Sequence, residues 1–551
     1  MRFKMRFGLI LVSMLLFLAG SAYALSAPDA VFFNGKVVTV DKGFTVQQAF
    51  AVQGEKFIAV GTNKKVKALA GKGTRLVDLK GATVIPGLSD NHDHMFNTVR
   101  LTGRGVDMIG VSSKAEMQSR LKKAVATAKP GQVVFTTLGW AINPRPTRKD
   151  LDEVSAEVPI ALVGSRRGVA VYNSAALKLA GITKESPTFA GMPVPKDASG
   201  EFTGASPGFP AAMHLLAKLL PPMTQAEEEE VIIRGLKERN ALGITSIREL
   251  AVWPEVVQAY YRVWRQGKLT GRVGIGLEFP DQVNTAKHLA TIGFGGDFGD
   301  QWLRIDSQGE EPWTPGAMAN QPYTELMLTL NRLGWRPSPH SSADANRGIG
   351  FDDTTNQTMA AYEAADRAAS IKDKRWYLEH MFFVTPEQIA RIAKLNLIIS
   401  TQDNGYLPQL AYFPKEKERL EYQNPVRSWL DAKLVVIGGS DYNGPTPDEL
   451  HPNNPLIPFY FYVTRKAKDG SLRNVAQKIS RPEALRIFTA NTAYASFEEK
   501  IKGSIQAGML ADFVILSQDL MTVPDDKILE TKPLATFVGG KKVYSAAGSK
   551  F

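Results

Sequence analysis

Two histidines one residue apart, His92 and His94, follow a short apolar run that begins at Thr83. If this run is a strand, residues two apart point to the same side, and both imidazoles project together from its end. Imidazole is a common ligand of divalent metal ions, and thiolate ligands are excluded because the chain contains no cysteine. We therefore interpret the pair as part of a metal site.

Three later residues also lie in or directly after a probable strand. His340 follows "WRPSP", His380 lies within "RWYLEHMFF", and Asp441 ends the very apolar run "KLVVIGGSD". A single histidine in a strand is more often a core residue, and an aspartate after Gly-Gly-Ser is often only a turn residue. Four histidines and one aspartate at successive strand ends are a stronger signal, and they predict one shared metal site.

The elements that must position these residues alternate between helix and strand. The segment "TQAEEEEVIIRGLKERNALG" has a capping box, Thr224 with Glu227, and a terminating Gly243, after which "ITSI" begins a strand. Repeats of this kind imply parallel strands with crossover helices, and the (β/α)8 barrel is the commonest such architecture for a chain of this size. Barrel active sites lie at the carboxyl ends of the strands, where the metal-site candidates fall.

The fold class that this pattern predicts is α/β, with a (β/α)8 TIM-type barrel at residues 83–495. A Pro- and Gly-rich stretch at about 101–215 is longer than barrel loops need, and we expect it to form an insertion near the barrel mouth. Short alternating strands at 25–82 and 496–551 predict a small β-sandwich domain built from both chain ends.

Residues 1–24 have the composition of a signal peptide, with a basic start, an apolar stretch from Phe7 to Gly20, and small residues at Ala22 and Ala24. We therefore expect export, most simply to a bacterial periplasm, with no membrane insertion after cleavage. The formal net charge of +11 falls to +8 without the three basic residues of this segment. The sequence has no arginine-rich run with interleaved aromatic residues, which argues against a nucleic-acid partner.

The chain resembles the amidohydrolase superfamily of metal-dependent hydrolases, specifically amidohydrolase family 3, the YtcJ-like group. The resembling segments run from about residue 30 to 545 and are "VIPGLSDNHDHM", "NPRPTRKDLDEV", "YNSAALKLAGI", "GITSIREL", "HSSAD", "LEH", "GGSD" and "KGSIQAGMLADFVIL". The resemblance implies one or two divalent metal ions, with zinc expected first and manganese or iron as alternatives. It places the ligand roles on His92, His94, His340, His380 and Asp441.

The sequence departs from this family at two positions near the implied site. Family members often carry a middle-strand lysine whose carbamate bridges two metals, and Arg304 in "WLRIDSQGEEPW" falls at that place. Arginine stays protonated and only donates, so it cannot become a bridging carbamate. The family's Gly-His before "NSAAL" is replaced by Gly168 and Val169. We therefore expect one ion rather than two, unless a nearby acid such as Glu249 bridges instead.

In the one-ion arrangement His92, His94, His340 and Asp441 surround the metal, and His380 acts as an acid, base or oxyanion partner. The predicted reaction is hydrolysis of a carbon–nitrogen bond other than a peptide bond, in an amide, N-acyl, N-formyl or cyclic amide group. Asp441 would take a proton from the metal-activated water and pass it to the leaving nitrogen, while His380 polarises the carbonyl.

Two other functions stay open. The first is a non-catalytic binding or regulatory protein on an amidohydrolase scaffold, which Arg304 and Val169 favour and the retained ligand set disfavours. The second is a metal-dependent hydratase or lyase, which would use the same site. A serine hydrolase is rejected although residues 204–208 spell G-x-S-x-G, because Pro207 follows the serine and has no N–H for an oxyanion hole.

The substrate is expected to be a small molecule, with Trp140, Arg145, Arg304 and Tyr442 as candidate contacts. Trp140 and Arg145 lie in "GWAINPRP", and similar stretches line the pocket mouth in related proteins. A buried structural tryptophan beside a proline-stiffened loop explains this segment equally well. The sequence does not determine the metal, the substrate or the oligomeric state, and a homo-oligomer is one alternative.

Overall fold

The computed structural model describes residues 27–551 except for 103, 138, 141, 164–169, 184–185, 187, 190–191, 207–211, 213–214, 217, 221, 280–283, 294, 311–319, 344–349, 403–418 and 442–452. The predicted signal peptide therefore lies outside the described residues. Within the described part of the chain, no helix combines the length and the apolar character needed to cross a membrane.

Helices and strands alternate along the chain as the sequence predicts, and the strands form two parallel sheets. The five-stranded sheet has the order β17-β16-β15-β14-β8 and consists of β8 (Leu88–Asp93), β14 (Ile244–Val252), β15 (Arg272–Leu277), β16 (Leu303–Glu310) and β17 (Pro337–Pro339). The three-stranded sheet has the order β18-β19-β20 and consists of β18 (Tyr377–Leu378), β19 (Ile398–Gln402) and β20 (Val435–Gly439).

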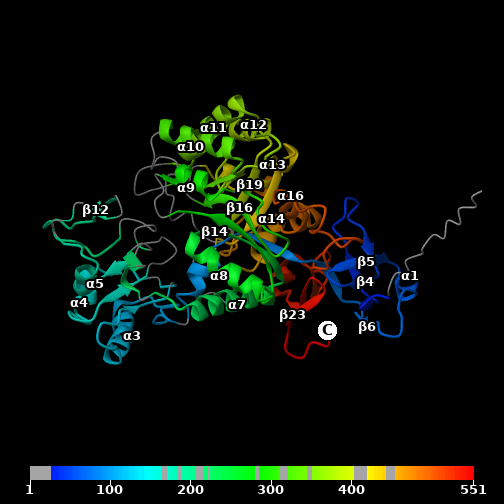
Figure 1. Cartoon of the computed structure of the whole chain (residues 1–551), viewed down its shortest axis with the longest axis horizontal. Coiled ribbons are helices and arrows are strands. Elements are labelled where there is room, and N and C mark those ends of the chain that lie inside the picture. The colour runs from blue at the N-terminus through cyan, green and yellow to red at the C-terminus, as the bar shows by residue number, and fades with distance from the viewer. Residues whose placement is uncertain are drawn as a thin grey trace, which may run out of the picture.

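The two sheets meet at both of their edges. A parallel bridge between His340 and Glu379 joins the ends of β17 and β18. At the other edge the N–H of Asp441 donates to the carbonyl oxygen of His92 at 2.7 Å, which brings the end of β20 beside β8. The strands thus curl into a TIM-like α/β fold, which confirms this part of the predicted fold class. Figure 1 shows β14, β16 and β19 at its centre, with the labelled helices α7 to α14 around them.

Two of the helices that pack around these strands, α7 and α12, begin at clear capping signals. Thr224 caps α7, and the predicted capping box with Glu227 is confirmed. Thr385 caps α12, which has Pro386 at its first position and buries Ile389 and Ile392 on one face. The helices of this part of the chain are α7 (Gln225–Ala241), α8 (Pro254–Arg265), α9 (Thr285–Ile292), α10 (Asn320–Leu333), α11 (Phe351–Ala368), α12 (Pro386–Lys394), α13 (Val426–Asp431), α14 (Leu456–Thr464), α15 (Arg481–Ile487) and α16 (Ala490–Ala495).

Strands from both chain ends form two further sheets, which share one aromatic core. The four-stranded sheet, β5-β4-β1-β6, consists of β1 (Ala30–Phe33), β4 (Ala49–Gln53), β5 (Lys56–Gly61) and β6 (Arg75–Asp78). The six-stranded sheet, β23-β22-β21-β7-β2-β3, consists of β2 (Lys36–Val38), β3 (Val46–Gln47), β7 (Thr83–Pro86), β21 (Phe513–Leu516), β22 (Pro533–Val538) and β23 (Lys541–Ser545). The ring of Phe32 stacks on Phe50 at 4.8 Å and meets the edges of Phe513 and Phe537 at 5.1 and 5.5 Å. That these sheets form a separate β-sandwich domain stays a prediction.

The apolar run before the histidine pair is two strands rather than one. Residues Thr83–Pro86 form β7, which pairs with β21 and β2 in the six-stranded sheet. Leu88–Asp93 form β8, which pairs with β14 in the barrel. Gly87 separates them, and a Cβ at this position would lie 2.1 Å from Oγ1 of Thr245. The chain therefore needs glycine here to pass from the terminal sheet into the barrel.

The segment between β8 and α7 has small sheets and hydrophobic clusters of its own. Its sheets have the orders β11-β10-β9 and β12-β13. In Figure 1 the cyan elements α3, α4 and α5 lie to one side of the barrel. The elements are α2 (Met95–Val99), α3 (Lys114–Ala126), β9 (Val134–Phe135), α4 (Arg148–Asp152), β10 (Ile160–Leu162), β11 (Val171–Tyr172), α5 (Ser174–Leu179), β12 (Thr188–Phe189) and β13 (Met192–Pro193). The remaining short helices of the described chain are α1 (Asn63–Lys67), η4 (Val475–Gln477) and η5 (Asp525–Glu530).

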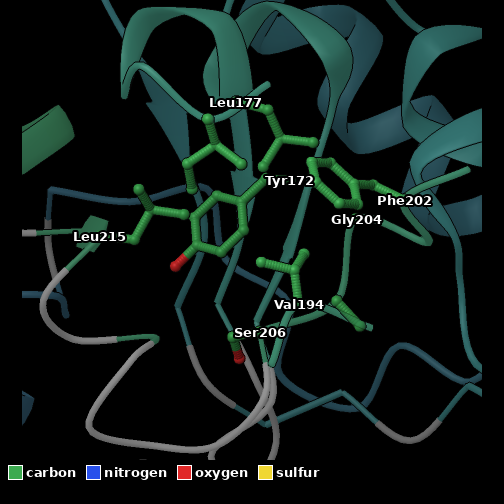
Figure 2. A pocket seen from close by; sticks show the side chains of 9 residues that line it. Tyr172, Leu177, Val194, Phe202, Gly204, Ser206 and Leu215 are labelled. Atoms are coloured by element: carbon green, nitrogen blue, oxygen red, sulfur yellow. The ribbon is translucent and has the colours of Figure 1, made fainter. Parts of the chain in front are cut away.

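The serine of the G-x-S-x-G sequence lies at a small pocket of this segment. Figure 2 shows Ser206 below the ring of Tyr172, with the apolar side chains of Leu177, Val194 and Leu215 around them. Oγ of Ser206 accepts a hydrogen bond from the N–H of Ala170 at 3.0 Å. None of the described residues that line the pocket is a histidine or an acid, so they supply no general base for this serine.

Candidate metal centre

His92 in β8 and His94 directly after this strand lie with their ring centroids 5.2 Å apart. Asp93 lies between them in sequence and points the other way, because successive strand residues alternate. Arg239 of α7 donates from Nε and Nη2 to the two oxygens of Asp93 at 2.8 and 2.9 Å. The ion pair is completely buried, and it anchors the strand end between the two histidines.

The ends of other strands bring the remaining predicted ligands to the same place. Oδ1 of Asp441, after β20, lies 3.7 Å from Nε2 of His92 and 3.5 Å from Nε2 of His94. The ring of His380, after β18, lies with its centroid 4.7 Å from that of His92 and 4.2 Å from that of His340. The structure therefore gathers all five of the residues that the resemblance implied as ligands.

A sixth residue, Glu310 at the end of β16, lies among these side chains. Its Oε2 is 3.3 Å from Nε2 of His92 and 3.1 Å from Nε2 of His94. Its Oε1 is hydrogen-bonded to Nδ1 of His340 and to Nε2 of His380. One carboxylate thus faces two different groups of histidines. We did not identify Glu310 from the sequence, although it ends a strand in "RIDSQGE", which is the signal that identified the other ligands.

Arg304 does not occupy the place that the sequence comparison gave it. It lies near the start of β16, six residues before Glu310, which is about 20 Å along an extended strand. There it donates to the carbonyl oxygen of Ser496 at 2.8 Å, lies 3.6 Å from Glu498 and pairs with Asp297. The alignment of Arg304 with the bridging lysine is wrong, and an expected contact with substrate does not fit this position. Glu310, rather than Arg304, lies at the carboxyl end of β16, beside His92 and His94.

Glu249, the alternative bridging acid, faces away from the histidines. Its Oε1 accepts a hydrogen bond from the N–H of Phe96 at 2.7 Å, and its Oε2 accepts one from the hydroxyl of Tyr260 at 2.6 Å. Burial, and next the charge of Asp93, raise the pKa of Glu249 to about 8. Glu249 therefore connects β14 to α2 and α8 and does not bridge ions at the candidate metal centre.

Contact of the other predicted residues, Trp140, Arg145 and Tyr442, with substrate stays a prediction. Trp140 is buried and donates from Nε1 to the carbonyl oxygen of Val163 at 2.7 Å, in agreement with the structural interpretation of this tryptophan. The side chain of Arg145 is exposed. Tyr442 and Val169 lie outside the described residues.

The charges of the centre compensate one another in the metal-free protein. Burial lowers the pKa of His92, but the carboxylates of Glu310 and Glu379 outweigh it and raise the pKa to about 10. Burial also lowers the pKa of His94, and hydrogen bonds to Asp441 and Glu310 raise it well above its usual value. Burial raises the pKa of Glu310, and the surrounding histidines bring it well below 4.5. Protons on His92 and His94 thus balance the negative charge of the carboxylates, and a divalent cation would balance it in their place.

Two observations show that the donor set fits a metal ion. The buried Nε2 of His92 makes no hydrogen bond with any described residue, although carboxylate oxygens surround it. Among the described residues, two groups have ligand atoms within 4.8 Å of one another: His92 with Glu310 and His380, and His92 with His94 and Asp441. Nitrogen and oxygen ligands without sulfur suit zinc, manganese or iron.

The backbone at the centre adopts unusual conformations. His380 and Asp441 have φ values of 58° and 50°, a left-handed region that non-glycine residues rarely adopt and that costs about 1–3 kcal/mol each. At Gly439 a Cβ would lie 2.5 Å from both Cβ and the backbone nitrogen of His92. Strand β20 therefore approaches β8 closely only because this residue is glycine.

A sequence model of the amidohydrolase family matches residues 75–544. The chain belongs to the amidohydrolase family. This amidohydrolase is 28% identical to the protein LONG AFTER FAR-RED 3 of Arabidopsis thaliana, over 94% of this chain and 91% of that one. It is 25% identical to an N-substituted formamide deformylase of Arthrobacter pascens, over 95% and 99%. It is 24% identical to the putative amidohydrolase YtcJ of Bacillus subtilis, over 94% and 99%, so the YtcJ-like resemblance is confirmed.

The amidohydrolase also resembles solved structures along most of its length. A metal-dependent hydrolase from Pyrococcus horikoshii matches with a TM-score of 0.68 and 20% identity, over 90% of this chain and 99% of that one. An adenosine deaminase from Xanthomonas campestris with bound zinc matches with a TM-score of 0.53 and 15% identity, over 94% and 92%. At these identities the likeness shows the TIM-like fold alone.

Proposed function

We propose that this protein is an exported, metal-dependent hydrolase that cleaves a carbon–nitrogen bond in a small molecule. The observation that carries the proposal is the position of Glu310, whose two oxygens face two groups of metal-ligand side chains at the strand ends. Membership of the amidohydrolase family supports it. We also propose that the barrel is a closed (β/α)8 barrel, and that residues 25–82 and 496–551 form the small β-sandwich domain.

The proposal includes two divalent ions rather than the single ion expected from Arg304. Oε2 of Glu310, with His92, His94 and Asp441, would hold one ion, and Oε1, with His340 and His380, would hold the other. A carboxylate between them takes the bridging role for which arginine is unsuited. Zinc is the first choice, and manganese and iron also accept nitrogen and oxygen ligands.

Divalent ions held by these residues would supply an acidified water and a Lewis acid for a carbonyl oxygen. Asp441 supplies the proton transfer: burial raises its pKa, but a hydrogen bond to His94 and the charges of His380 and His92 lower it overall, so the carboxylate is ionised at neutral pH. Its side chain is 28% exposed, which leaves a path for substrate. The carboxylate accepts the proton of the attacking water at Oδ and delivers it to the departing nitrogen.

The substrate class follows from the relatives rather than from the described residues. An N-substituted formamide deformylase is among the relatives, so N-formyl amines are the first substrates to test, followed by N-acyl amines and cyclic amides. We also propose that residues 1–24 are removed on export to the periplasm. N-terminal sequencing of the mature protein tests this part.

Elemental analysis and a substrate panel test the proposed function. Protein loaded with zinc, manganese or iron is expected to hold two ions per chain and to hydrolyse an N-formyl, N-acyl or cyclic amide. His92→Ala should lose both properties. Native protein that takes up no metal and turns over no substrate would instead favour a non-catalytic binding protein. A hydratase or lyase would give a product that contains both parts of the substrate or an unsaturated one, which mass spectrometry distinguishes from hydrolysis.

A further inference from the structure

A buried carboxylate lies behind His92, on the side away from the other ligands. Nδ1 of His92 donates to Oε2 of Glu379 at 2.8 Å, and both side chains are 0% exposed. An ionised carboxylate only accepts hydrogen bonds. A neutral His92 must then carry its proton on Nδ1, which leaves the lone pair of Nε2 directed at Glu310 and Asp441.

Other strands hold Glu379 in turn. Its Oε1 accepts hydrogen bonds from Oγ of Ser338 at 2.5 Å and from Nη2 of Arg248. Arg248 also donates from Nε to the carbonyl oxygen of Asn91 at 2.9 Å, and its guanidinium lies 4.0 Å from the ring centroid of Tyr377. The side chain of Arg248 is 3% exposed. The carboxylate of Glu379, directly after β18, is therefore held by residues of β14 and β17, and it contacts His92 of β8.

Two of the other histidines, His94 and His380, have uncharged partners on Nδ1. His380 donates from Nδ1 to the neutral amide oxygen of Gln402 at 2.8 Å. Nδ1 of His94 lies 3.3 Å from the backbone carbonyl oxygen of Leu250. Of these three histidines, His92 is the one whose Nδ1 faces a charged partner. A carboxylate on the far nitrogen fixes the ring and raises the basicity of the near nitrogen.

We propose that Glu379, held by Arg248, is a positioning residue that fixes the ring of His92 and strengthens it as a metal ligand. The inference rests on the proposed metal-dependent function. A buried Arg–Glu pair that only stabilised the barrel would need one carboxylate oxygen, yet Oε1 binds Arg248 and Ser338 while Oε2 is directed at His92. Removing such a supporting carboxylate typically weakens metal binding by about 10- to 100-fold.

The test compares full-length wild type with Glu379→Gln and with Ser338→Ala, the matched control that removes a different hydrogen bond from the same carboxylate. Zinc affinity is measured by competition with a chromogenic chelator, and the visible spectrum of cobalt-loaded protein reports the ligand geometry. Glu379→Gln is expected to bind zinc about 10- to 100-fold more weakly and to change the cobalt spectrum. Ser338→Ala should stay within about threefold of wild type.

Glu379→Asp is a second variant for the same measurements, to be used if Glu379→Gln does not fold. It keeps a negative charge for Arg248, but it is one methylene shorter and cannot also reach Nδ1 of His92. We expect the metal-free protein to fold with a somewhat lower melting temperature, because the buried contact with His92 is lost, together with weakened zinc binding. If the folded Glu379 variants bind zinc like wild type and give the same cobalt spectrum, the inference is wrong while the proposed function stands. If wild type binds no metal, both are wrong.

Discussion

Oε2 of Glu310 lies 3.1 Å from Nε2 of His94, while Oε1 of the same carboxylate is bonded to Nδ1 of His340. The two histidines come from strands on different sides of the barrel, β8 and β17. A single side chain therefore reaches both halves of the candidate metal centre. The proposed two-ion site rests on this arrangement.

Replacing Glu310 should remove one ion and most of the activity. Glu310→Gln keeps the size of the side chain, but an amide offers one acceptor oxygen and cannot bridge two cations. We expect metal content to fall from two ions per chain to one or fewer, and turnover to fall by at least about 100-fold. Arg304→Gln, on the same strand, is the control: it should lower stability but leave the metal content unchanged. Equal metal loss in both variants would contradict the assignment of Glu310.

Asp441→Asn should separate proton transfer from metal binding. The amide cannot accept the proton of water, so kcat should fall by about 10²- to 10⁴-fold, the usual contribution of a general base. The other five side chains of the centre are intact in this variant, so elemental analysis should still find metal. An Asp441→Asn enzyme with wild-type turnover would rule out this role.

Gly439→Ala tests the close approach of β20 to β8. The added methyl group would lie 2.5 Å from His92, so either the strand or the histidine must move. We expect a loss of about 1–3 kcal/mol in the free energy of unfolding, as for other overpacked sites, together with weaker zinc binding. Gly73→Ala is the matched control, since a Cβ there meets no atom within 4 Å. Thermal melting and metal titration on both variants check this, and unchanged zinc affinity in Gly439→Ala would contradict it.

The metal-free protein should show a pH dependence that the metal-loaded protein lacks. Because carboxylates raise the pKa of His92 from 6.5 to about 10, its contribution to stability is complete below pH 6.5 and is lost as the pH rises through about 10. Glu310 has a lowered pKa, so its contribution is present above pH 4.5 and is lost as the pH falls through its folded-state pKa.

Melting temperatures of chelator-treated protein across pH 4–10 measure this effect, and His92→Asn should flatten the alkaline part of the curve. Metal binding must displace the proton of His92, so zinc affinity should increase with pH. Calorimetry in buffers of different ionisation enthalpy counts the protons released. Zinc binding without proton release at pH 7 would show that His92 is already neutral in the metal-free protein.

From the amino-acid sequence alone, the alternation of helix and strand predicts the TIM-like α/β fold. The strand repeat of two residues places His92 and His94 on one side, and the resemblance to amidohydrolase family 3 implies the five expected ligands. The same rule applied to the end of "RIDSQGE" would have identified Glu310. Arg304 was wrongly assigned to the metal centre because the motif similarity indicates which strand it lies in, but not at which end of that strand.

Which residues meet depends on how the chain folds in three dimensions. His92 and Glu379 are 287 residues apart in sequence, and Glu310 and His380 are 70 apart, so nothing local specifies these contacts. They arise because the barrel brings the carboxyl ends of its strands to one face, where side chains from distant segments compensate each other's charge. The sequence therefore indicated the ligand types, and the meeting of the two sheets brought Glu310 between the histidines and Glu379 behind His92.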